Sequence, residues 1–216
     1  MKKIIVLIFS LGILSQASAQ SFQTGSLVVS LDWGFDISNV LQTYSLYNVP
    51  NSTTTKTGNA ASTNWNLGGE IGVLKWLGVG LQFKLDNYIT SKDSSTGNTP
   101  TAIGFEVGVV GNIHIIRHQH FDLLGGVDFG YSQLTYNAND GFNNQIYGSG
   151  TWLDFHAAMR IYLGRFGFNL TVYSPIINYP SLTSNNSGLG LGESLLASWK
   201  GTGGGFNLGI QYRILN

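Results

Sequence analysis

The sequence predicts an all-β protein, an eight-stranded antiparallel up-and-down β-barrel that spans a membrane and is preceded by a cleaved signal peptide. Apolar residues alternate with polar or small residues through most of the chain, the pattern of strands with two chemically different faces. Only 10% of the residues are charged, whereas the chain holds 29 glycines and 12% aromatic residues. A soluble domain usually carries more charge, so the composition favours lipid around the apolar faces.

The N-terminus has the three parts of a secretory signal peptide. Two lysines are followed by an apolar run over residues 4–14 and by a small-residue cleavage motif at residues 17–19. The apolar run is about a dozen residues, shorter than the roughly 18 to 20 residues of a membrane-spanning helix. We therefore expect a signal peptide over residues 1–19 and one β-barrel domain over residues 20–216. The chain contains no cysteine, which excludes disulfide bonds and lipid attachment through cysteine.

Eight runs of alternating residues give the strands. In the first run, Leu31 and Trp33 share an apolar face, while Ser30, Asp32 and Gly34 lie on the opposite face. In chain order, the apolar faces extend from Leu27 to Phe35, Trp65 to Val73, Leu77 to Leu85, Ile103 to Ile115, Phe121 to Tyr131, Leu153 to Leu163, Phe166 to Val172 and Phe206 to Ile214. A run of about ten residues, at about 3.3 Å per residue and a tilt near 40°, covers the apolar height of about 25 Å of a transmembrane barrel.

The opposite faces of these runs hold mainly glycine, asparagine and serine with single charges. After the first run they comprise, in order, Asn64 to Gly72, Gly78 to Asp86, Gly104 to His114, Asp122 to Ser132, Asp154 to Tyr162 and Gly205 to Arg213. A soluble barrel or sandwich is the alternative, and its outer face would be rich in lysine and glutamate. Small polar faces fit a narrow barrel interior better, so the membrane barrel is favoured.

Long and short connections alternate between the runs. The long ones, of about 12 to 29 residues, start near Ile37, Ile89, Asn137 and Pro175, and the short ones, of about two to five, lie near Trp76, His118 and Gly164. Bacterial transmembrane barrels place short turns in the periplasm and long loops outside the cell. We therefore expect both termini in the periplasm and the long loops on the extracellular side.

Glycine-punctuated strands such as residues 124–131, Leu-Gly-Gly-Val-Asp-Phe-Gly-Tyr, resemble those of the eight-stranded barrel family of outer membrane proteins A and X. The resemblance covers Ser26 to the C-terminus, although the last strand ends Ile214-Leu215-Asn216 where that family usually ends on an aromatic residue. It implies a monomer in the bacterial outer membrane, in contact with outer-membrane lipid and inserted by the barrel-assembly machinery.

Ten ionisable residues occupy inward-facing positions. Six lie near mid-height and form the predicted interior charge network: Asp32, Glu70, Lys84, Glu106, Asp128 and Arg160. Asp86, Asp154 and His156 are placed nearer the outside, and Arg213 nearer the periplasm. The interior of an eight-stranded barrel is just wide enough for side chains, so we expect a polar plug in which Lys84 and Arg160 bridge carboxylates of neighbouring strands. A conducting pathway is the alternative, and the excess of carboxylates would then favour cations.

The loops are rich in Asn, Ser, Thr and Gly, and a few apolar residues depart from that composition. The candidate contact residues of the loops are Tyr44, Tyr47, Leu195, Leu196 and Trp199, with Leu189 and Leu191 nearby. Packing of these apolar residues is the favoured interpretation, and a short helix over residues 194–200 on the outer leaflet, or a partner site, is the alternative.

Catalytic and metal sites are not expected. Asp154 and His156 have a spacing that resembles the acid-base dyad of outer-membrane aspartyl proteases, but Asp86 is the only candidate for the second carboxylate pair of that family. His118 and His120 are too few ligands for a metal site, and the sequence indicates no cofactor. Without Lys2 and Lys3 the mature chain has nine basic and eleven acidic residues, so a nucleic-acid partner is not indicated.

These observations together predict an integral outer-membrane barrel with a structural or binding role through its long loops and an unidentified extracellular ligand. A narrow porin-like channel, weakly selective for cations, is the alternative, and an outer-membrane hydrolase is third.

Overall fold

The computed structural model describes residues 22–46, 49, 52–90, 97–137, 139, 145–185 and 194–215. They form eight strands: β1 (Leu27–Leu46), β2 (Thr53–Gly72), β3 (Leu77–Tyr88), β4 (Thr101–His118), β5 (Phe121–Asn137), β6 (Gln145–Leu163), β7 (Phe166–Ser184) and β8 (Ser194–Leu215). Within these residues, no helix is long and apolar enough to cross a membrane. The predicted signal peptide, residues 1–19, lies outside the described residues.

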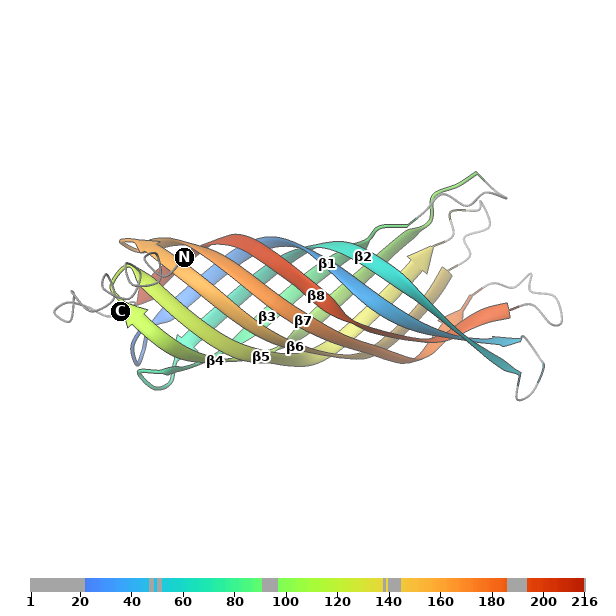
Figure 1. Ribbon diagram of the computed structural model, residues 1–216, viewed down its shortest axis with the longest axis horizontal. Helices are drawn as coiled ribbons and strands as arrows, with labels where there is room; N and C mark the ends of the chain where they lie inside the picture. The colour runs from blue at the N-terminus through green and yellow to red at the C-terminus, as the bar shows by residue number, and fades with distance from the viewer. Residues whose placement is uncertain are drawn as a thin grey trace, which may run out of the picture.

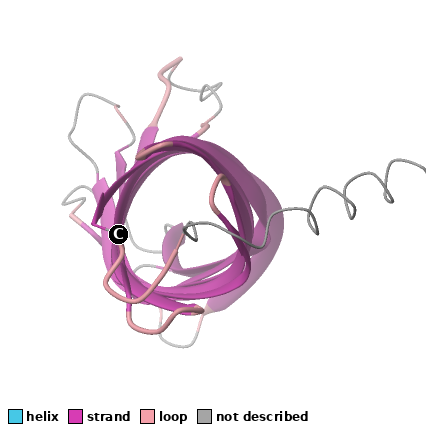
Figure 2. Ribbon diagram, turned by 90° about the vertical axis from the view of Figure 1, so that its left-hand side faces the viewer, coloured by secondary structure: helices cyan, strands magenta, loops and turns pink. Residues whose placement is uncertain are grey.

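The eight strands form one closed antiparallel barrel in chain order (Figures 1 and 2). Each strand pairs with the next, and β1 pairs with β8 from Leu27 opposite Leu215 to Leu46 opposite Ser194. Closure satisfies the backbone groups that an open sheet edge would expose to lipid at several kcal/mol each. The predicted all-β, eight-stranded up-and-down barrel is confirmed.

The two ends of the barrel differ. At the turn end, residues 73–76, 119–120 and 164–165 join neighbouring strands, and β1 begins and β8 ends there. Gly164 takes a positive φ of 70°, which a two-residue turn requires and which glycine adopts without strain. At the loop end, the strands are joined by residues 47–52, 89–100, 138–144 and 185–193.

The first and last loops are much shorter than predicted, because the strands continue past the expected ends. A loop was expected to start at Ile37, but β1 runs to Leu46, and β2 already begins at Thr53. The loop expected from Pro175 is likewise mostly strand, since β7 continues to Ser184 and β8 begins at Ser194. Residues 53–57 are polar on both faces, so the extension of β2 carries no alternation from which a strand could be predicted.

A belt of apolar side chains covers the outside of the barrel. Leu81 and Phe168 are 56% and 57% exposed on its surface, as are many other outward residues of the alternating runs. Two aromatic pairs stand towards opposite ends of the belt: Trp33 opposite Trp65, and Phe166 edge-on to Tyr212 at 4.8 Å between ring centroids. A large exposed apolar surface is stable when it faces lipid, so the belt marks this barrel as membrane-spanning.

Glycines on the inner wall leave room for large side chains of other strands. A Cβ on Gly108 would lie 2.8 Å from the indole of Trp152, and a Cβ on Gly78 would overlap the carboxyl group of Glu70. A larger residue at these positions would force the facing side chains to move. The lumen is therefore filled by side chains that reach over a glycine-lined wall.

Candidate functional site: the filled interior and the loop end

All eight acidic side chains that the structure describes are buried inside the barrel. They are Asp32, Asp36, Glu70, Asp86, Glu106, Asp122, Asp128 and Asp154. Lys84 is buried among them, and the side chain of Arg160 is only 11% exposed. The six residues of the predicted network thus lie in one interior, together with Asp36 and Asp122, which the prediction omitted. The inward position follows from the strand period, because alternate residues point to the same face.

A cluster of two carboxylates, an arginine and a histidine fills the interior towards the turn end. The guanidinium Nη1 of Arg160 on β6 lies 2.7 Å from Glu70 Oε2 on β2, across the lumen, and 4.0 Å from Asp122 Oδ2. The ring of His114 bridges the same two carboxylates, with 2.8 Å from each ring nitrogen to its carboxylate oxygen. Two buried carboxylates therefore share an arginine and a histidine as their partners.

Phe22, just before β1, covers this cluster at the turn end. Its ring is fully buried and stacks on His114, with ring centroids 3.5 Å apart and planes within 10°. The backbone of the same segment bonds to β2, where Gly25 donates to the carbonyl of Gly72 and Gly72 donates to that of Ser26. Sequence reasoning missed Phe22 because it precedes the first alternating run.

A second charge cluster surrounds Lys84 nearer the loop end. Its ammonium nitrogen lies 3.4 Å from carboxylate oxygens of both Asp86 and Glu106, and 5.2 Å from the centroid of the Tyr173 ring. Glu106 is the direct register partner of Lys84 on β4. The predicted bridging between neighbouring strands is therefore present at Lys84, whereas the shorter ion pair of Arg160 crosses the lumen.

Asp36 has no ion-pair partner among the residues that the structure describes, but it accepts hydrogen bonds from three side chains. Its Oδ2 receives the hydroxyl of Ser62 at 2.9 Å, the amide of Asn64 at 3.4 Å and the hydroxyl of Tyr173 at 3.2 Å. The Tyr173 hydroxyl also accepts from Asn64 at 2.8 Å. Neutral donors therefore stabilise this buried carboxyl group in place of a cation.

Between the two charge clusters the interior encloses a small polar chamber of about 70 Å³. His156 lies at its wall, with Nδ1 3.2 Å from Asp128 and Nε2 2.8 Å from the side-chain oxygen of Asn112. Asn169 donates to Asp32 at 2.6 Å. A chamber of this size holds a few water molecules, since each needs about 10 to 15 Å³.

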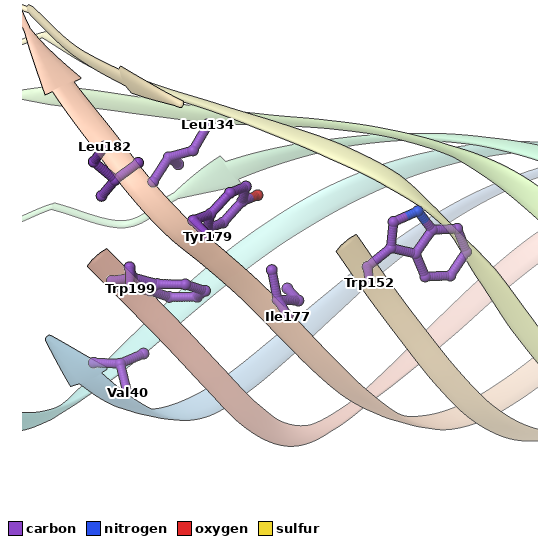
Figure 3. Packing of buried hydrophobic residues seen from close by; sticks show 7 residues of the cluster. All are labelled: Val40, Leu134, Trp152, Ile177, Tyr179, Leu182 and Trp199. Atoms are coloured by element: carbon purple, nitrogen blue, oxygen red, sulfur yellow. The ribbon is translucent and has the colours of Figure 1, made fainter. Parts of the chain in front are cut away.

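Above the polar interior, an apolar cluster fills the barrel towards the loop end (Figure 3). It consists of Val40, Leu134, Trp152, Ile177, Tyr179, Leu182 and Trp199, which come from five strands. The rings of Tyr179 and Trp199 are 5.6 Å apart, and the Tyr179 hydroxyl is bonded to Ser132 at 2.6 Å. The cluster closes the lumen over the charges.

At the loop end, a cavity of about 380 Å³ opens above this cluster. Its lining comprises Gln42, Tyr44, Asn59, Ala60, Tyr88, Ile89, Thr90, Ala102, Leu134, Tyr136, Ile146, Leu196 and Trp199. None of these lining residues carries a charge, and four have aromatic rings. Three of the contact residues predicted from sequence, Tyr44, Leu196 and Trp199, thus meet in one cavity.

The alternative of a short helix at residues 194–200 is wrong, because these residues begin strand β8 and pair with β1. Trp199 points inward and is buried, as the packing interpretation expects. Leu195 lies one position before Leu196 on β8. Tyr47, Leu189 and Leu191 lie outside the described residues. A contact role for these side chains stays a prediction.

Asp154 and the histidines singled out in the sequence lie in two different parts of the barrel, the chamber wall and a turn. Asp154 and His156 are enclosed in the chamber wall, and His120 bonds to the carbonyl of Tyr162 at 3.1 Å. Among the described residues, no group of three or more His, Cys, Asp or Glu side chains has an arrangement that could hold a metal ion.

The fold and its interior define a transmembrane β-barrel whose lumen is filled by side chains. No protein-family model matches the sequence, and a comparison with curated proteins finds no match. Solved structures do match. The outer membrane protein OprG from Pseudomonas aeruginosa has a TM-score of 0.60 at 12% identity, over 90% of this chain and 98% of OprG.

Two further structures agree with that match. Neisserial surface protein A has a TM-score of 0.55 at 7% identity, over 87% of this chain and 97% of its own. The outer membrane protein AlkL, solved in lipid bilayers, has a TM-score of 0.54 at 14% identity, over 94% of this chain and 96% of its own. This chain therefore has the fold of the small outer-membrane β-barrels, the class that its sequence resembles.

Proposed function

We propose that the protein is a bacterial outer-membrane barrel that binds a ligand at its loop end and does not conduct solutes through its lumen. The observation that carries this proposal is the filled interior, in which two charge clusters and the apolar cluster leave a chamber of only about 70 Å³. The larger cavity opens at the loop end instead. The proposal assigns no catalytic activity to the protein, and a monomer is expected.

The orientation in the membrane is part of the proposal. Short turns face the periplasm in bacterial barrels of this kind, so the loop end would face the outside of the cell. The chain lacks cysteine, which allows single cysteines to report on each end. Thr55→Cys, at the loop end, should react with a membrane-impermeant maleimide on intact cells, and Arg165→Cys, at a turn, should react only after lysis. The reverse pattern would contradict the orientation.

The lining of the loop-end cavity favours an uncharged ligand with an apolar body. Leu134, Leu196 and Trp199 supply apolar surface, and the amides of Gln42 and Asn59 supply hydrogen-bonding groups. Binding sites for small molecules combine a mainly apolar lining with a few polar groups in this way. Charged ligands would lose their hydration without a partner charge in the described lining.

The ligand class can be tested with octanol as a neutral probe and the barrel in lipid nanodiscs. Octanol should shift the NMR methyl signals of Leu134 and Ile146 saturably, whereas those of the outward Leu81 should shift linearly as octanol enters the lipid. Trp199→Ala should abolish the saturable shift. Trp65→Ala removes the same side chain from the outer surface and is the matched control. Only linear shifts at every methyl group would contradict binding.

A narrow cation-preferring channel remains the second candidate, and the surplus of carboxylates inside the barrel favours it. Conductance recordings in planar bilayers distinguish the binding barrel from the channel. The binding proposal predicts no steps in conductance from the purified protein, while reproducible cation-selective steps would support the channel.

A further inference from the structure

The turns of the barrel and the strand residues beside them carry basic and apolar side chains but no acidic ones. Residues 73–76 are Val-Leu-Lys-Trp, residues 115–120 are Ile-Ile-Arg-His-Gln-His, and residues 163–166 are Leu-Gly-Arg-Phe. Asp122, which follows the second of these segments, is fully buried inside the barrel. The connections at the loop end have the opposite balance in their sequence, one lysine against three acidic residues: Lys92, Asp93, Asp140 and Glu193.

Lys75 and Arg117 lie side by side on this rim. Nη1 of Arg117 donates to the backbone carbonyl of Lys75 at 2.6 Å, and the backbone N–H of His114 donates to the carbonyl of Trp76 at 2.8 Å. The turn after β2 is thereby fastened to the end of β4. Lys75 is exposed, and it forms no ion pair with any residue that the structure describes. Two cationic side chains that meet without an exposed carboxylate produce a local positive potential, which attracts anions.

The neighbours of these two cations are exposed apolar residues. Leu74 and Trp76 flank Lys75, and Ile116 precedes Arg117, all three with exposed side chains that continue the apolar belt. Exposed apolar and aromatic residues beside a cation are typical of the level at which the hydrocarbon of a membrane meets the headgroups. A turn surrounded only by water would gain nothing from them. The anion that these cations attract is therefore expected at the membrane surface.

The turn between β6 and β7 repeats this arrangement on the same rim, which Figure 2 shows from its open end. Arg165 is exposed and is followed by Phe166, an exposed residue whose ring packs edge-on against Tyr212. Leu163, on the other side of the turn, is exposed as well. A cation next to exposed apolar side chains thus recurs at a second position of the turn end.

We propose that the turn end binds anionic phospholipids, with the lipid phosphate at Lys75 and Arg117 and the acyl chains along the apolar belt. Arginine and lysine are the side chains that bind phosphate groups, and each one near an anionic membrane surface strengthens association by about fivefold. Residues 20–216 hold nine basic and eleven acidic residues, so the net charge of the chain does not attract an anionic lipid and a preference must come from the local arrangement. An acidic soluble partner would explain the cations but not the exposed apolar residues beside them.

The test compares two spin-labelled lipids around the full barrel refolded into phosphatidylcholine vesicles. The fraction of motionally restricted probe in the electron spin resonance spectrum gives the relative affinity of phosphatidylglycerol, which is anionic, and of phosphatidylcholine, which is not. The wild type should prefer phosphatidylglycerol, and the preference should fall with added NaCl. Lys75→Gln keeps the length of an exposed side chain and should lower the preference by about twofold to fivefold. Arg165→Gln should lower it in the same direction.

Lys56→Gln is the matched control, because it makes the same substitution at an exposed position of the loop end. It should keep the preference of the wild type. Equal affinities of the wild type for the two lipids would overturn the proposal, and an equal loss in Lys56→Gln would reduce the effect to net charge and overturn it too. Displacement of phosphatidylglycerol by inorganic phosphate at the same ionic strength would show a site for free phosphate and not for lipid.

This site and the loop-end cavity lie at opposite ends of the barrel and share no residue. Lys75→Gln should therefore leave the saturable octanol shifts unchanged, so either proposal can fail without the other.

Discussion

The interior of this barrel is filled in two different ways along its axis. In the section around Lys84, buried charges are held by ion pairs and hydrogen bonds, with each group depending on named partners. In the section around Trp152 and Tyr179, apolar side chains pack without charge. The outer surface changes along the axis as well, because the apolar belt around the charges is replaced near the apolar cluster by exposed polar residues such as Thr57, Asn59 and Lys200. Removing a side chain should therefore leave an unpaired charge in the section around Lys84 and an empty volume in the section around Trp152. Substitutions in the two sections test this contrast.

Lys84→Met should have the largest effect. The substitution keeps most of the volume but leaves Asp86 and Glu106 without their shared cation, and unpairing a buried charge costs about 3 to 5 kcal/mol. The free energy of unfolding, from urea titration of protein refolded in lipid vesicles, should fall by that amount. Lys56→Met, at an exposed position, removes the same group and should leave the urea midpoint unchanged. Equal midpoints for the two variants would show that the carboxyl groups do not depend on Lys84.

Trp152→Ala should cost about 3 kcal/mol, the lower part of the range for removing a buried Trp side chain. Here the loss is a cavity over Gly108 and not an unpaired charge. The same urea titration measures it, followed by the heat-dependent gel shift of the folded barrel. Trp65→Ala faces lipid and should cost less. If the outward variant were the more damaging one, packing in the lumen would not stabilise the loop end.

The fold could be predicted from the sequence because one face of each strand contacts lipid. Alternation of residues such as Leu31 and Asp32 is a strong signal when the two faces have different surroundings. The same dependence explains the error in the first loop, since Thr53 to Thr57 have water on both sides and no alternation results. Strand number and face were predictable, and strand length beyond the membrane was not.

The interior site was only partly predictable. The alternation of side chains along a strand places Lys84 and Glu106 inside the barrel, and the strand register makes them neighbours. The pair of Arg160 and Glu70 joins strands that are not adjacent, so it depends on barrel closure and on how far a side chain reaches across the lumen. Phe22 lies before the first strand, where no periodic pattern exists, and its stacking on His114 had no signal in the sequence.

Gly126→Ala tests how tightly the polar section is packed. A Cβ at this position would overlap the side chains of Asn112 and His156, so the chamber wall must shift, at about 1 to 3 kcal/mol. Gly125→Ala is the matched control on the same strand, because its added Cβ would meet only the carbonyl of His156 at an ordinary 3.7 Å. Urea titration should separate the two variants. Equal stabilities would mean that the chamber wall yields easily, unlike a packed core.

Tyr173→Phe should have the smallest effect, about 1 kcal/mol, because it removes one hydroxyl that Asp36 and Asn64 share. Asp36 would keep its hydrogen bonds from Ser62 and Asn64, so the carboxyl group would lose one of its three donors. Tyr212→Phe removes the same atom from a half-buried position at the turn end and serves as the control. If Tyr173→Phe lowered the free energy of unfolding as much as Lys84→Met, the polar section would act as one indivisible network. A loss near the value of a single hydrogen bond would show that its members contribute separately, as the side chains of the apolar cluster do.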